Sequence, residues 1–208
     1  MKKINRNKSS LIDTKKEINF VFNGKKYTGF KGDTLGSALL ANNVKLIGRS
    51  FKYHRPRGII SHGSEEPNGL VELINNHYNE PNTKITTLEL YEGLKAKSQN
   101  CWPSVKYDLM SINDKLSNFI SAGFYYKTFM WPSSFWEKIY EPLIRKAAGL
   151  GSLSLSNSSR NSVKGFLHCD VLIIGSGPSG LVSAYIAGLS GAKVILVEED
   201  FVFGGSLN

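Results

Sequence analysis

The chain has 208 residues, of which 41% are hydrophobic, and this is enough apolar material for one or two domains with buried cores. No apolar run approaches the length of a membrane span, and the basic start MKKINRNKSS lacks the apolar core of a signal peptide, so we expect a cytoplasmic protein. The two cysteines, Cys101 and Cys169, lie far apart in the sequence, which favours neither a disulfide framework nor a C-x-x-C metal site.

The basic residues are concentrated near the start of the chain, and residues 1–16 are predicted to form a basic, flexible tail. The formal net charge of +9 is compatible with nucleic-acid binding. Basic residues on a solvated tail need no partner, however, and an asparagine- and lysine-rich composition raises the isoelectric point by itself. We therefore expect neither a nucleic-acid partner nor a membrane partner.

Residues 17–100 begin with a pattern that is typical of a β-hairpin. The alternating apolar segments 18–22 and 26–30 flank Asn23-Gly24, a strong two-residue hairpin signal. A helix is predicted next, with Asp33 as its N-cap. Its repeating positions are Leu35, Ala38, Leu39 and Asn42.

Two later segments, 70–74 and 86–90, are predicted to be extended and to complete a small mixed sheet packed on that helix. A hairpin, a helix and further strands in this order indicate a β-grasp domain over residues 17–100.

The segment from Arg49 to Arg57 interleaves basic and aromatic side chains within this domain. Such a segment is suited to stacking on bases or binding phosphates. It is equally suited to holding carboxylates of another domain or subunit. We favour the second role because the cluster lies inside a folded domain.

Residues 101–148 are rich in aromatic side chains and are predicted to form a helical connector between two domains. The spacing of Trp136, Ile139, Tyr140, Leu143 and Ile144 is helical, and Pro132 and Pro142 punctuate it. We expect these aromatic residues to fill a core rather than a ligand site. The serine- and glycine-rich residues 149–166 then predict a flexible linker.

Residues 167–208 carry the strongest functional signal in the chain. The apolar run 171–174 predicts a strand buried on both faces and leads into the motif GSGPSG, which a helix from Pro178 to about Ser190 follows. A second buried strand is predicted at 194–197 and ends at Glu198. This order of strand, glycine turn, helix, strand and acid is typical of a dinucleotide-binding unit.

Each position of the motif has a defined task in such a unit. Gly175 permits the tight turn, Gly177 lets the backbone approach a pyrophosphate, and Gly180 lets the helix pack close to the strand. Glu198 is expected to accept hydrogen bonds from ribose hydroxyls, which favours FAD or NAD over NADP. The predicted binding residues are Gly175, Ser176, Gly177, Pro178, Ser179, Gly180 and Glu198.

The Gly204-Gly205 pair after the acid resembles the turn after the second strand in flavoprotein reductases and amine oxidases. A complete dinucleotide domain needs several more strands. Residues 167–208 are thus expected to be the start of a longer Rossmann-type FAD/NAD(P)-binding domain, and the chain an N-terminal fragment. We assign no catalytic or metal-binding residue.

Three stretches together resemble the N-terminal part of the α subunit of heterotetrameric sarcosine oxidase. They are the string that begins FNGKKYTGFKGDTLG, the aromatic stretch SAGFYYKTFMWPSSFWEKIYEPLIRK and the motif HCDVLIIGSGPSG. The first stretch also resembles a plant-type [2Fe–2S] ferredoxin domain. Cluster binding requires four cysteines, and residues 43–66 contain none, so a ferredoxin fold without a cluster is expected.

The resemblance implies an oxidoreductase subunit that acts on CH–NH groups. It implies NAD on this subunit, FAD and FMN elsewhere in the complex, and β, γ and δ subunits as partners. The complex would oxidise sarcosine to glycine, form hydrogen peroxide and transfer the methyl carbon to tetrahydrofolate as 5,10-methylenetetrahydrofolate.

Two alternatives stay open. One is a subunit of another FAD- or NAD-dependent amine dehydrogenase or of a cyanide synthase, which shares the glycine motif. The other is a noncatalytic assembly module that acts through the segment from Arg49 to Arg57.

Overall fold

The computed structural model describes residues 11–75, 79–120, 122–124, 127, 129, 131–149, 151, 153 and 163–207. The chain divides into two compact units, Met1–Ser158 and Ser159–Asn208. Most of the expected tail and most of the expected linker lie outside the described residues. Within the described ranges, no helix combines the length and the apolar character that crossing a membrane requires.

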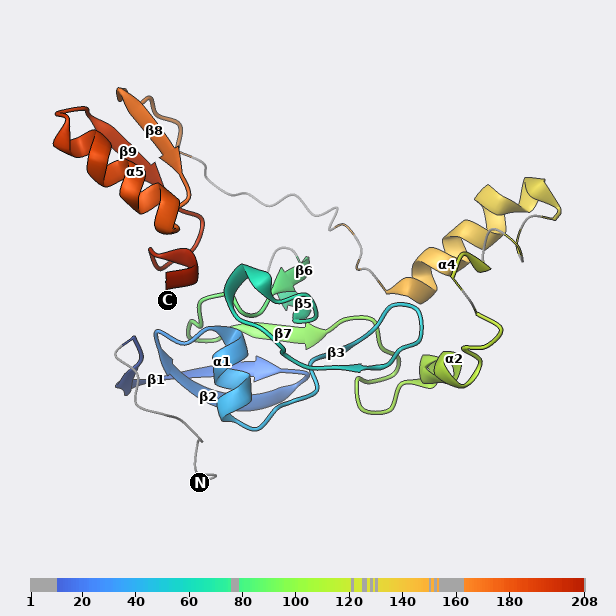
Figure 1. Cartoon of the computed structure of the whole chain (residues 1–208). Coiled ribbons are helices and arrows are strands. Elements are labelled where there is room, and N and C mark those ends of the chain that lie inside the picture. The colour runs from blue at the N-terminus through green and yellow to red at the C-terminus, as the bar shows by residue number, and fades with distance from the viewer. Residues whose placement is uncertain are drawn as a thin grey trace. The chain divides into compact units, whose positions relative to one another are not determined.

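The first unit is built on a five-stranded mixed sheet (Figure 1). Its strands lie in the order β2-β1-β7-β5-β6, and β1 and β7 run parallel while the other neighbours run antiparallel. The strands are β1 (Asp13–Phe22), β2 (Lys25–Lys31), β5 (Leu70–Ile74), β6 (Asn79–Lys84) and β7 (Lys95–Ser98). A short separate ladder joins β3 (Gly48–Arg49) to β4 (Pro56–Arg57).

The predicted hairpin is confirmed, since β1 and β2 pair across Asn23 and Gly24. Both turn residues have positive φ angles, 50° and 75°, as a tight turn between twisted strands requires. The predicted helix is also present as α1 (Leu35–Ala41), which lies beside β1 and β2 in Figure 1. Hairpin, helix and mixed sheet together confirm the β-grasp fold.

The expected N-cap of α1 is wrong by one residue. Thr34 caps the helix and forms a capping box with Ser37. The buried Asp33 carboxylate instead accepts from the Ser37 hydroxyl at 2.6 Å and from the Phe30 amide at 2.8 Å. Asp33 therefore ties the end of β2 to the helix start.

The hydrophobic core lies between α1 and the sheet. Helix residues Leu35 and Leu39 and strand residues Phe20 and Val71 are fully or almost fully buried. The other members of this cluster are Phe22, Ala38, Ile47, Leu73, Ile85, Leu90, Leu94 and Ala96.

The strand prediction succeeded at 70–74 and failed at 86–90. Residues 85–88 form a turn and a bend, and Glu89 makes only an isolated bridge with Thr34. The segment nevertheless supplies buried Ile85 and Leu90 to the core, which explains its apolar pattern. Strands β6 and β7 were not predicted, because their sequences NEPNTK and KAKS are polar and one contains a proline.

The connector holds short helical segments with exposed aromatic side chains. These are η2 (Leu109–Ser111), α2 (Ile112–Lys115), η3 (Ser133–Phe135), the π-helical η4 (Trp136–Tyr140) and α4 (Glu141–Ala148), while η1 (Gly63–Glu65) lies earlier in the chain. Trp102, Phe119 and Trp131 are 64%, 83% and 84% exposed. These three side chains are not part of the core of the first unit, and their place in a core between the two domains stays a prediction.

The second unit contains the expected strand, helix and strand. β8 (Val171–Ile174) and β9 (Val194–Val197) pair in parallel, α5 (Pro178–Leu189) connects them, and η5 (Gly205–Leu207) follows. The bounds match the sequence prediction closely. Ile174 in β8 is 83% exposed, because a two-stranded sheet with a single helix leaves apolar surface uncovered. This exposure agrees with the expectation that residues 167–208 are the start of a longer domain.

Candidate dinucleotide-binding site

The predicted glycine motif forms the turn between β8 and α5. Gly175 has a φ angle of +95°, which favours glycine. A Cβ atom on Gly180 would lie 2.0 Å from the carbonyl oxygen of Gly175, so only glycine allows the helix to approach the strand this closely. A Cβ atom on Gly177 would meet nothing within 4 Å, so the space beside this residue is open to a ligand.

The N-terminus of α5 begins directly at this turn. Gly177 is the N-cap, and Pro178 and Ser179 open the first helical turn. The backbone N–H groups of a first turn have no partners within their own helix, and the helix dipole is positive at this end. The turn and helix start therefore offer donors suited to a pyrophosphate.

Glu198 and Ser176 are brought together at the end of the two strands. One carboxylate oxygen of Glu198, Oε2, accepts from the Ser176 amide at 2.6 Å and from its hydroxyl at 2.5 Å. The other oxygen, Oε1, accepts from the amides of Glu199 at 2.8 Å and Asp200 at 3.2 Å. The hydrogen bond from the Ser176 side chain, followed by the backbone amides, lowers the pKa of Glu198 to about 2.

Sequence reasoning did not assign the Gly204-Gly205 pair to the site, although it noted the pair. The Gly204 amide donates to the buried Ser176 hydroxyl at 3.1 Å. A Cβ atom on Gly205 would lie 3.2 Å from the Cα atom of Gly177. The glycine turn, the end of β9 and the Gly-Gly turn thus form one hydrogen-bonded group around Ser176.

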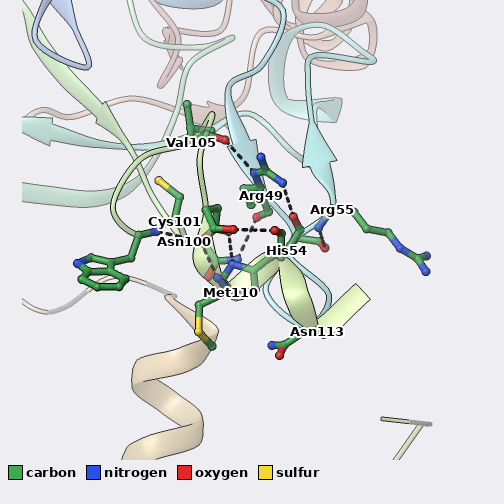
Figure 2. A network of polar contacts seen from close by, with 12 residues as sticks. Arg49, His54, Arg55, Asn100, Cys101, Val105, Met110 and Asn113 are labelled. Carbon is green, nitrogen blue, oxygen red and sulfur yellow. Dashed lines mark hydrogen bonds and ion pairs between the residues drawn. The ribbon is translucent and has the colours of Figure 1, made fainter. Parts of the chain in front are cut away.

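The basic segment from Arg49 to Arg57 contacts the connector of its own unit. The Arg49 guanidinium donates to the carbonyl oxygens of Val105, His54 and Lys106 at 2.8, 2.9 and 3.2 Å. Figure 2 shows Arg49 pointing into this network and Arg55 pointing away from it. Arg55 donates to the Asp114 carboxylate at 2.6 Å, and both side chains of this pair are about half exposed.

A buried histidine and aspartate lie at the centre of the same network. The Nδ1 atom of His54 lies 2.6 Å from the Asp108 carboxylate, and both side chains are almost fully buried. Asp108 also accepts from the amides of Trp102 and Met110 at 3.0 and 3.2 Å. Burial, and then the Asp108 charge, raise the pKa of the neighbouring Cys101 thiol. These contacts fix the loop after β7, and they give the network a structural role.

Two family models match the chain. Residues 15–101 match a 2Fe-2S iron-sulfur cluster binding domain, and residues 170–208 match an FAD dependent oxidoreductase. The two matches confirm the expected fold class, a ferredoxin-like β-grasp domain followed by the start of an FAD-type dinucleotide domain.

The same matches contradict the expected cofactor set of NAD on this chain, FAD and FMN elsewhere, and no iron–sulfur cluster. The first model places residues 15–101 in an iron–sulfur domain family, and the second one points to FAD. A [2Fe–2S] cluster is held by four thiolates, and Cys101 is the one cysteine in the matched range. The cysteines of this chain therefore do not fit that ligand set by themselves.

The chain is similar to several curated proteins along nearly its whole length. It is 54% identical to the sarcosine oxidase subunit alpha of Rhizobium meliloti (strain 1021), over 96% of this chain and 20% of that protein. It is 30% identical to the sarcosine oxidase subunit alpha of Corynebacterium sp. (strain U-96), over 94% of this chain and 16% of that protein.

The solved structure of L-proline dehydrogenase from P. horikoshii aligns with 91% of this chain, and the alignment covers 26% of the dehydrogenase chain, with 19% identity and a TM-score of 0.45.

The chain spans about a fifth, or less, of the length of the curated relatives. The resemblance expected from the sequence is confirmed: along nearly its whole length, the chain is similar to alpha subunits of sarcosine oxidase.

Proposed function

We propose that the turn and helix at residues 175–180, with Glu198, bind the adenosine diphosphate portion of FAD. The observation that carries this proposal is the combination of a positive φ angle at Gly175, open space beside Gly177 and a helix N-terminus at the same turn. The match of residues 170–208 to FAD dependent oxidoreductases supports FAD as the dinucleotide.

The residues divide the work of binding between them. Amides at the start of α5 hold the pyrophosphate, and Gly177 allows it to come close. Glu198 is ionised at any pH well above 2. When FAD binds, a ribose hydroxyl donates to the Glu198 carboxylate and replaces one of its present donors, such as the Ser176 hydroxyl or the Asp200 amide. The bound FAD would accept a hydride, and the protein positions the cofactor and sets the electrostatic environment around it.

We further propose that the chain works within an amine-oxidising complex of the sarcosine oxidase type. The names of the curated relatives support sarcosine as substrate and an assembly of several subunits. In this proposal, beta, gamma and delta subunits complete a heterotetramer. The complex converts sarcosine to glycine with formation of hydrogen peroxide, and tetrahydrofolate takes up the methyl carbon as 5,10-methylenetetrahydrofolate.

Binding is tested by adding a bulky side chain where the structure leaves space. Gly177 has a φ angle of −63°, which any residue adopts, so Gly177→Val is expected to fold normally. Its side chain would occupy the position of the pyrophosphate and weaken FAD binding by about tenfold or more, or at least 1.4 kcal/mol. The measurement is quenching of flavin fluorescence on titration of FAD with the full chain.

The matched control is Gly188→Ala in α5, where a Cβ atom also meets nothing within 4 Å. This variant is expected to bind FAD as the parent chain does. Equal affinity of the parent and Gly177→Val for FAD would contradict the proposed site.

The activity is tested separately, on the chain coexpressed with its neighbouring subunits. Sarcosine-dependent peroxide formation, measured with and without tetrahydrofolate, is expected from the purified complex. A complex that oxidises another amine without forming peroxide would favour an amine dehydrogenase instead, whatever the outcome of FAD binding.

A further inference from the structure

A large cleft in the first unit lies outside the proposed dinucleotide site. Its volume is about 1230 Å³, and it is bordered by the start of β2, the segment after α1, the loop after β7 and helix α4. Apolar and aromatic side chains form part of its wall, among them Tyr27, Val44, Pro103 and Tyr107.

The cleft carries an excess of positive charge. Its lining includes six basic side chains and two carboxylates, and each carboxylate is paired with a basic neighbour. Glu72 lies 3.0 Å from the Lys97 ammonium, and Glu141 pairs with Arg145. The remaining four are Lys25, Lys45, Lys106 and Lys146.

These four lysines are exposed and make no ion pair with any residue that the structure describes. The Lys106 ammonium lies over the ring of Tyr107, 5.2 Å from the ring centroid, which is within the limit of about 6 Å for a cation–π contact. The cleft therefore presents four positive charges to whatever occupies it. An occupant with several negative charges is favoured by simple complementarity.

The size of the cleft and the strand beside it favour an extended polypeptide over a small anion. Pockets for small molecules usually measure about 300–1,000 Å³, and this cleft is larger. Strand β2, which contributes Lys25 and Tyr27, is an edge strand of the sheet. Edge strands present unpaired backbone groups that an extended segment can use.

The uncompensated charge of the cleft comes from its lysines. The one arginine among the lining residues, Arg145, is already paired with Glu141.

We propose that this cleft binds an acidic segment of a partner polypeptide. The four lysines receive its carboxylates, and the apolar wall contacts the stems of its side chains. This interaction is independent of FAD, because every residue in it belongs to the first unit.

The test uses the full chain and a fluorescein-labelled ten-residue glutamate peptide, with binding followed by fluorescence anisotropy at low salt. The triple variant Lys25→Gln, Lys45→Gln, Lys106→Gln is expected to bind this peptide about tenfold more weakly, because it removes three of the four charges that receive the carboxylates. The affinity of the parent chain should also fall as salt is added.

The matched control is Lys26→Gln, Lys31→Gln, Lys95→Gln, which removes three exposed lysines of the same sheet that do not line the cleft. It is expected to bind the peptide as the parent chain does. The proposal is overturned if the parent does not bind the peptide or if both triple variants lose affinity equally. It is also overturned if inorganic phosphate or a twelve-nucleotide RNA binds to the four lysines more tightly than the peptide.

Discussion

At the scale of single residues, Glu66 is a buried carboxylate of the β-grasp domain. Its side chain is fully buried, and its carboxylate accepts from the amides of Ile60, Ser61 and Asn68, each at 2.7 Å. Burial alone raises the pKa of Glu66, but the amide hydrogen bonds outweigh burial and hold the pKa below its ordinary value. The ionised carboxylate therefore organises the loop before β5.

The variant Glu66→Gln is expected to lower the free energy of unfolding by about 3 kcal/mol, because an amide in this position leaves buried N–H donors without a full set of acceptors. The measurement is urea denaturation at pH 7. The control is Glu65→Gln, an exposed neighbour that should change stability by less than about 0.5 kcal/mol.

The same residue predicts how stability depends on pH. Because the pKa of Glu66 is lowered in the folded protein, its contribution is present above its unfolded pKa of about 4.3 and is lost as the pH falls through the folded value. The parent chain should thus lose more stability than Glu66→Gln between pH 5 and pH 3. Parallel losses in both proteins would contradict this role.

Residue roles were predictable from sequence where the backbone dictates the residue type. Gly175 and Gly180 lie as expected, because a positive φ angle and a close approach to backbone each exclude a side chain. The role of Ser176 was not predictable, because it depends on Gly204 and Glu198 being folded against it. Local motifs contain no information on such contacts.

At the scale of elements, the His54–Asp108 pair joins the β3–β4 hairpin to the loop after β7. The Asp108 carboxylate accepts hydrogen bonds from two amides of its own loop and contacts His54. Removal of this carboxylate therefore removes three hydrogen bonds at once. Asp108→Ala is expected to lower the free energy of unfolding by about 3 kcal/mol and to speed amide hydrogen exchange in residues 101–115.

The control for this variant is Asp114→Ala, which removes an exposed partner of Arg55. An exposed pair of this kind contributes about 0–1 kcal/mol, so exchange in residues 101–115 should stay close to that of the parent chain. If the two aspartate variants behave alike, buried Asp108 does not hold the loop.

Elements with strong local signals were found from the sequence, and elements held only by their neighbours were not. The β1–β2 hairpin follows from Asn23-Gly24, and α5 follows from its glycine motif. Strand β7 is KAKS, four residues whose pairing with β1 and β5 depends on its central place in the sheet. Tertiary pairing overrides weak local preference there.

At the scale of the whole molecule, the two units differ in how completely they bury their apolar residues. The first unit has a closed core around Phe20 and Leu39. In the second unit, Ile174, Tyr185 and Leu189 are 83%, 68% and 71% exposed. The sequence predicted that β8 and β9 are buried, because their residues are apolar. An apolar sequence shows which residues favour burial, but it does not show which other elements cover them.

This difference predicts how the units behave when separated. Residues 1–158 are expected to keep a cooperative unfolding transition in urea, because their sheet and helix enclose a core. Residues 159–208 alone are expected to lack such a transition and to bind the dye ANS, because two strands and one helix bury too little apolar surface for independent stability. Circular dichroism and dye fluorescence on both pieces measure this. A sharp transition for residues 159–208, without dye binding, would show that β8, α5 and β9 form a self-sufficient folding unit.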